Sequence, residues 1–356
     1  MRTLSHWQLN RALLARQGLL ERREASIPAT LDAMGTLQAQ YAPSMYIGLW
    51  SRIAGFRRDA LTEALHRREV VQATLMRVTI HLCSREDFWP LVAPLRDARR
   101  TLWLRTRRGI TEQAMAAGAE ALRAALANGP LKRREIDALV GKEIAPGVGL
   151  WVDLVRVPPS GTWERRRADL YGLADDWLAP RTDPDPGDAL DHLVSRYLTG
   201  FGPAAKADIA NWAGLTAKEV EPALGRLSLN RFTAEDGTEL LDLPGAPLPD
   251  AATPAPVRFL PTWDAVLLAH ARRTQVLPEQ HRAKIFHTKM PQSIGTFLVD
   301  GAVAGKWRVE RTKEKATLRL EPFEPLPRGW RAGVREEAER LVRFHEPDAT
   351  SFAVRG

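Results

Sequence analysis

Two glutamines separated by one small residue are the side chains whose type and spacing first suggest chemistry. They lie in Leu37-Gln38-Ala39-Gln40-Tyr41, which we expect at the end of an apolar helix. An amide oxygen can orient water or face a positive charge, although it cannot remove a proton at neutral pH. The alternative is that both are ordinary surface residues, since glutamine favours helices and is usually exposed. On a continuous helix they would point roughly 200° apart, so a shared site requires the helix to end or distort, which Pro43 allows.

Residue patterns for metal or nucleotide chemistry are absent from the sequence. The eight histidines form no HxxxH or HxH pair, and the single cysteine, Cys83, cannot anchor a zinc finger. There is no GxSxG, no Walker loop and no strand-coupled GxGxxG. We therefore expect no metal, no nucleotide cofactor and no other cofactor. Cys83 lies in an apolar, strand-like stretch and is expected to be buried and inert.

The positive charge is concentrated at the N-terminal end. The 356-residue chain has a formal net charge of +8, and residues 1–110 contain 18 arginines and nine acidic residues, so the rest is nearly neutral. This distribution suits a polyanionic partner. Arginine runs are more often simply solvated, but those in this region are candidates for phosphate contacts. The candidates are Arg57, Arg58, Arg67, Arg68, Arg99, Arg100, Arg105, Arg107 and Arg108.

The elements around the glutamines belong to a first predicted unit, residues 1–85. Its pattern of N-caps and apolar stripes predicts three or four helices and then a hairpin. The helices are expected over residues 5–18, 26–43, 46–53 and 59–68, and the hairpin over Val70–Ser84. Helices followed by a two-stranded hairpin are typical of a winged helix.

The same order recurs twice. Residues 86–180 show helical patterns at Thr111–Ala127, Pro130–Val140 and Gly147–Val155, with a strand over 162–172. The third unit, residues 187–245, is the clearest. Its helices are expected over Asp188–Leu198, Pro203–Trp212 and Thr216–Leu227, and its hairpin turns at Asp236-Gly237.

Beyond the linkers Ala179–Gly187 and Leu243–Pro256, residues 255–356 change character. Strands are expected at Val257–Leu260, Gly295–Val309 and Ala316–Phe323, and a closing helix at Arg331–His345. The predicted fold class is mainly α with β (α+β): three tandem winged-helix units followed by a β-rich C-terminal domain.

A resemblance to a known family covers nearly the whole chain. Residues 35–40 (GTLQAQ) and 76–82 (MRVTIHL), with 260–264 (LPTWD) and 298–307 (LVDGAVAGKW), resemble the winged-helix DNA glycosylases of the AlkZ and YcaQ (AlkX) type. The AlkZ branch has a Gln-aliphatic-Gln motif that maps onto Gln38 and Gln40, whereas the YcaQ branch has Asp at the second position. Ala39 is at the small end of what the middle position holds.

The resemblance implies an architecture and a reaction. Its winged helices and β-rich domain would form a C around a basic channel for double-stranded DNA carrying alkylated purines. The enzyme would be a monofunctional glycosylase that excises cationic bases such as N7-alkylguanine, including bulky natural-product adducts and interstrand crosslinks, in DNA repair or self-resistance. Gln38 and Gln40 would be the catalytic residues and would orient the attacking water.

Four other residues are weighed as support for the lesion site. Arg77, Thr79 and His81 are expected to alternate on one strand face and to reach DNA, although cross-strand packing and a satisfied histidine are the commoner outcomes. Asp264 could stabilise cationic charge, or could equally cap a helix that begins at Ala265.

Two non-enzymatic interpretations remain open. A winged-helix transcriptional regulator would read DNA through the helix at Thr216–Leu227, but Glu219 and Glu221 make that face unsuited to a major groove. An adaptor that uses its winged helices for protein contacts accounts less well for the N-terminal charge. No apolar run of about 18 residues occurs, so we expect no membrane span and a cytoplasmic protein. We expect a monomer, because the repeated units can cover one another.

Overall fold

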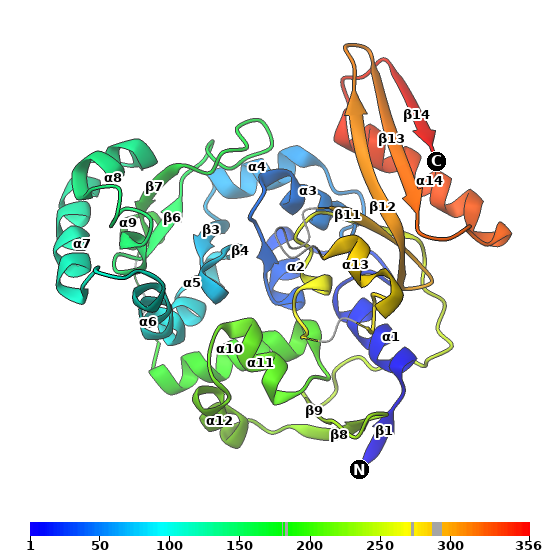
Figure 1. Cartoon of the computed structure of the whole chain (residues 1–356), viewed down its shortest axis with the longest axis horizontal. Coiled ribbons are helices and arrows are strands. Elements are labelled where there is room, and N and C mark those ends of the chain that lie inside the picture. The colour runs from blue at the N-terminus through cyan, green and yellow to red at the C-terminus, as the bar shows by residue number, and fades with distance from the viewer. Residues whose placement is uncertain (180, 182–183, 272–273, 287–293) are drawn as a thin grey trace.

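The computed structural model describes residues 1–356 except 180, 182–183, 272–273 and 287–293. Its first unit has the predicted order of helices and a hairpin (Figure 1). Ser5 and Ser26 begin the first two helices, because each side chain accepts a hydrogen bond from the first helical turn. The elements are α1 (His6–Arg16), α2 (Ile27–Met34), α3 (Ala42–Trp50), α4 (Arg58–His66), β3 (Val70–Thr74) and β4 (Ile80–Ser84).

The second unit departs from its predicted pattern. The helix expected at Gly147–Val155 is wrong: only the turn η3 (Val148–Leu150) forms before strand β6 (Leu154–Arg156), with Gly147 in front of the turn and Gly149 inside it. The strand expected over 162–172 shrinks to β7 (Leu170–Leu173), because Ser160 and Thr162 bond to nearby carbonyls and hold a loop. The other elements are α5 (Arg85–Val92), α6 (Arg96–Thr106), α7 (Glu112–Leu126), β5 (Leu131–Lys132), α8 (Arg133–Val140) and α9 (Ala174–Trp177).

One sheet joins the first two units. Its strand order is β2-β4-β3-β6-β7-β5, where β2 is Leu37–Gln38. The junction is the antiparallel pairing of β3 with β6 at Gln72 and Arg156. The predicted boundary near residue 85 therefore separates two sets of helices but not two sheets.

The third unit matches its prediction. Helices α10 (Pro186–Phe201), α11 (Lys206–Ala213) and α12 (Ala217–Arg226) precede the hairpin β8 (Asn230–Ala234) and β9 (Glu239–Asp242). A strand from the start of the chain, β1 (Arg2–Leu4), adds in parallel to β8. This long-range pairing was not predicted.

The tail is a sheet covered by a helix, as predicted. Strand β10 (Arg258–Leu260) is followed by the hairpin β11 (Gly295–Val299) and β12 (Ala302–Arg311), then by β13 (Lys315–Pro322). Helix α14 (Arg328–His345) packs on this sheet, and a strand that the sequence did not indicate, β14 (Ser351–Arg355), pairs in parallel with β13. The short α13 (Arg282–Ile285) lies between β10 and β11.

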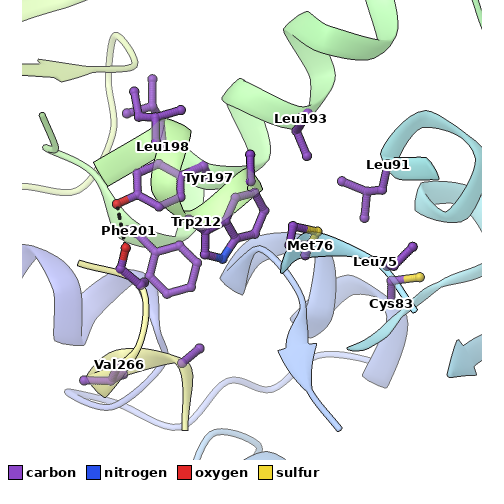
Figure 2. Packing of buried hydrophobic residues seen from close by; sticks show 14 of the residues in the cluster. Leu75, Met76, Cys83, Leu91, Leu193, Tyr197, Leu198, Phe201, Trp212 and Val266 are labelled. Carbon is purple, nitrogen blue, oxygen red and sulfur yellow. Dashed lines mark hydrogen bonds between the residues drawn. The ribbon is translucent and has the colours of Figure 1, made fainter. Parts of the chain in front are cut away.

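A shared apolar core joins the units. Figure 2 shows Trp212 of α11 beside Tyr197 and Phe201 of α10, with Met76 from the first unit and Val266 from the tail nearby. The ring centroids of Tyr197 and Trp212 are 5.2 Å apart. The first unit's hairpin, the third unit and the tail therefore meet at this core, next to the glutamine segment.

Candidate active site

The glutamine segment is extended, not helical. Helix α2 ends at Met34 because Gly35 adopts a left-handed conformation (φ 74°), so the helix predicted to reach Pro43 is eight residues long. Gln38 pairs with His81 of β4, and the ladder continues through the Ala39 N–H, which donates to the Ile80 carbonyl at 2.7 Å. Side chains alternate along a strand. Leu37 and Ala39 enter the apolar core, which leaves Gln38 on the opposite side of the segment.

The glutamines line neighbouring hollows. Gln38 is 6% exposed and borders a cavity of about 10 Å³, shared with Arg77 and His81, which is roughly the space for one water molecule. Gln40 is exposed and borders a hollow of about 210 Å³. Its Oε1 accepts from the Ile80 N–H at 3.3 Å. The two amides thus border separate hollows beside the β3–β4 hairpin.

His81 is a neutral neighbour of Gln38. Burial, together with the positive charge of Arg77, lowers the pKa of its imidazole to about 3. Its Nδ1 lies 3.0 Å from the Thr79 carbonyl oxygen, to which the neutral ring donates through Nδ1–H. Nε2 is then an acceptor, so His81 presents a lone pair and no positive charge.

Arg77 and Thr79 lie in a tight turn, so the expectation that both share a strand face with His81 is wrong. The turn is η1 (Met76–Val78), in which Arg77 and Val78 both have positive φ. Thr79 Oγ1 donates to the Met76 carbonyl at 2.9 Å. Arg77 Nη1 donates to the Trp212 carbonyl at 3.3 Å, which ties the turn to α11.

Asp264 forms a buried ion pair with Arg52. Both side chains are 0% exposed, with Nη2–Oδ1 and Nη1–Oδ2 distances of 2.8 and 3.0 Å. Asp264 also accepts a hydrogen bond from the Val266 N–H at 3.0 Å and so caps the turn η4 (Ala265–Leu267). This is the second of the two roles expected for Asp264, that of a cap before Ala265. Ala265 lines the Gln38 cavity, so this pair fixes one of its walls. Arg52 was missed, although an arginine in the apolar run LWSRI is a visible signal.

The end of α2 is fixed against α10. Gln17 Nε2 donates to the carbonyls of Met34 (2.9 Å) and Gly200 (2.8 Å), and its Oε1 accepts from Arg52. A Cβ added at Gly200 would lie 2.3 Å from the Met34 carbonyl oxygen. Only glycine allows this approach, which determines where the chain leaves α2 towards Gln38.

The candidate phosphate-binding arginines differ in their surroundings. Arg58 and Arg68 lie over the rings of Trp163 and Trp177, and Arg67 pairs with Glu63 and Glu69. Arg99 is buried, so the alternative of a simply solvated side chain is wrong for this residue. The others are exposed or half-buried: Arg57, Arg100, Arg105, Arg107 and Arg108. Their contact with DNA stays a prediction.

The described residues contain neither a metal-binding cluster nor a membrane-spanning helix. Within the described ranges, there is no cluster of three histidine, cysteine, aspartate or glutamate side chains suited to a metal ion. Over the same residues, every helix is too short or too polar to cross a membrane.

The fold and the paired amides define a class: a tandem winged-helix protein with a β-rich tail and a Gln-x-Gln site at a hairpin tip. The model of the AlkZ-like DNA glycosylase family matches residues 31–344, so the chain belongs to this family of DNA repair enzymes. The solved structure of the DNA glycosylase AlkZ from Streptomyces sahachiroi is similar, with a TM-score of 0.81, 19% identity and 99% of each chain covered. A search of curated proteins gave no match.

Proposed function

We propose that this DNA glycosylase excises cationic N-alkylated purines from double-stranded DNA by attack of water at C1′. Alkylation at guanine N7 or adenine N3 makes the base a good leaving group, so no strong general acid is needed. What remains is to orient water and to stabilise an oxocarbenium-like sugar, and amide oxygens are suited to both tasks.

The observation that carries this proposal is that Gln38 and Gln40 lie two residues apart on an extended segment beside the β3–β4 hairpin, and each borders a hollow. Gln38 borders a water-sized cavity, and Gln40 is exposed where DNA can approach. His81 adds an acceptor without a positive charge that would repel a cationic base.

The side chains at the site favour a monofunctional enzyme. A bifunctional glycosylase requires an amine nucleophile, and no lysine occurs among the described residues that line the two hollows. We further propose that the protein acts as a monomer on a basic channel lined by N-terminal arginines. Simple N7-methylguanine and bulky N7 adducts or crosslinks both fit this chemistry.

The test is base release from duplexes that contain N7-methylguanine or uracil. The wild type should release the alkylated base and leave an alkali-labile site, but should not release uracil. Gln38→Ala and Gln40→Ala should slow release by roughly tens- to thousands-fold, because positioning of water is lost.

Gln113→Ala, at an exposed glutamine of α7, is the matched control and should keep full activity. Efficient release of uracil, or full activity in both site variants, would contradict the mechanism. Sequence-specific binding to undamaged DNA without any release would favour the regulator.

A further inference from the structure

The hollow beside Gln40 is lined by arginines to which the proposed reaction assigns no role. It lies between the first two units and is lined by Thr74 and Ile80 of the hairpin, by Ile136 of α8 and by Tyr171 of β7. At about 210 Å³ it is much larger than the cavity of about 10 Å³ beside Gln38. It has room for a ligand larger than water.

Two buried arginines face this hollow. Arg156 of β6 is 8% exposed and Arg99 of α6 is 5% exposed. Arg156 Nη2 donates to Thr74 Oγ1 at 3.3 Å, and its guanidinium lies 5.5 Å from the ring centroid of Tyr171. Arg99 contacts the Thr74 carbonyl and, at 3.4 Å, Asp153.

These guanidinium groups are not fully satisfied by the protein. Within the described part of the chain, neither Arg156 Nε nor Arg99 Nε has a hydrogen-bond partner, although both atoms are buried. Burial lowers the pKa of both side chains, that of Arg99 to about 10. Arg99 has Asp153 as a counter-charge, whereas Arg156 forms no ion pair with a described residue; the buried Nε donor without an acceptor is unfavourable in both.

The charge around the hollow is unbalanced. Among the described lining residues, the cations are Arg99, Arg133 and Arg156, whereas Asp153 is the one carboxylate. Asp153 also accepts from Arg96 at 2.9 Å. Arg133 is paired with Asp137 at 2.7 Å, so among these lining residues the surplus charge is that of Arg156. It suits an anion with several acceptor oxygens, because guanidinium groups bind phosphoryl groups through parallel N–H donors.

We propose that this hollow is a phosphoryl-binding site in which Arg156 and Arg99 are the ligands. The choice of DNA as the source of the phosphoryl group rests on the proposed function: Gln40 borders the hollow, so the phosphate would belong to the backbone next to the damaged nucleotide. A free phosphate or nucleotide is the other source of the same chemistry.

The first experiment is thermal unfolding in inorganic phosphate against chloride at equal ionic strength, and it involves no base release. Specific binding should raise the wild-type Tm by about 1–3 °C beyond the general salt effect. Arg156→Met should lose this increment. Arg335→Met, at an exposed arginine of α14, is the control and should keep it. An equal increment in wild type and Arg156→Met, or none in the wild type, overturns the site. Arg99→Met gives the same readout if Arg156→Met fails to fold.

The second experiment identifies the source. A single uncharged methylphosphonate is moved through the phosphates that flank an abasic-site analogue in a duplex. At one position, wild-type affinity should fall about tenfold and the salt dependence by about one charge, whereas Arg156→Met should not distinguish that position. No positional effect together with a phosphate-dependent Tm increment assigns the site to a free phosphate. If base release fails while both results hold, the chemistry is wrong but the site stands.

Discussion

At residue scale, the polar groups beside Gln38 that the proposed chemistry would use are neutral. Arg77 borders the Gln38 cavity, but its Nη1 donates to the Trp212 carbonyl, and the neighbouring imidazole of His81 is kept neutral by burial. Amides are neutral at every physiological pH. The Gln38 amide and the His81 imidazole therefore do not titrate near pH 7, so the rate of excision should not depend on their protonation there.

Because the pKa of His81 is lower in the folded state than in the unfolded chain, the unfolded chain binds more protons between about pH 3 and 6.5. The contribution of His81 to stability is therefore present above pH 6.5 and is lost as the pH falls towards 3. From pH 7 to 5 the wild type should lose about 2 kcal/mol through this residue. Urea unfolding of wild type and His81→Gln at both pH values measures it, since the variant lacks this titration. Parallel losses in the two proteins would exclude the neutral buried imidazole.

At the scale of elements, the glutamine strand depends on how closely α2 approaches α10. Gly200 of α10 lies against the Met34 carbonyl, and Gly35 ends α2 with a left-handed conformation. The first residue of β2 follows two residues later. Movement of α10 away from α2 would therefore displace Gln38 relative to His81.

Gly200→Ala should force that movement, because its methyl carbon would lie 2.3 Å from the Met34 carbonyl oxygen. We expect a loss of about 1–3 kcal/mol in the free energy of unfolding, together with slower base release. Gly225→Ala is the matched control: this glycine of α12 has open space at its Cβ, so the substitution should be neutral or slightly stabilising. Chemical denaturation and the release assay check both. If Gly200→Ala changed neither the free energy of unfolding nor base release, α2 and α10 could separate without cost.

How much of this arrangement the sequence predicts depends on the range of the interactions. The third unit is correct because Thr216 caps α12 and Asp236-Gly237 turns the hairpin, and both signals are local. Helix α5, which contains Pro90, was not among the helices given bounds for the second unit, although Trp89 lies in a helical pattern. Strand β2 is two residues long and exists only through its pairing with β4. The sequence and the family resemblance singled out Gln38 and Gln40, but not the extended backbone on which they lie.

For the whole molecule, the Arg52–Asp264 pair connects the first unit to the C-terminal domain. Both charges are fully buried; Gln17 accepts a further hydrogen bond from Arg52, and Asp264 accepts one from the η4 turn. Breaking such a pair costs more than forming it gains, because the remaining charge is left buried without a partner. The attachment of the two domains thus depends on both residues together.

Asp264→Ala should reduce the free energy of unfolding by about 3–5 kcal/mol. The double variant Arg52→Met/Asp264→Leu should recover most of the loss, apart from about 1 kcal/mol for the missing cap. Glu339→Ala, in an exposed pair on α14, should cost about 0.5 kcal/mol or less. Guanidinium unfolding of the wild type and the three variants measures these losses. A larger loss in the double variant than in Asp264→Ala would mean that the two charges act independently.

The pairing of β1 with β8 also constrains how the protein is made. Residues 2–4 bond to residues 232–234, with Leu4 fully buried there. At bacterial or eukaryotic translation speeds, the ribosome needs roughly 10–50 s to produce the second partner after the first. Throughout that interval the nascent amino-terminal strand has no sheet to join, so this edge of the third unit is completed late in synthesis and is the place where a chaperone would be most useful.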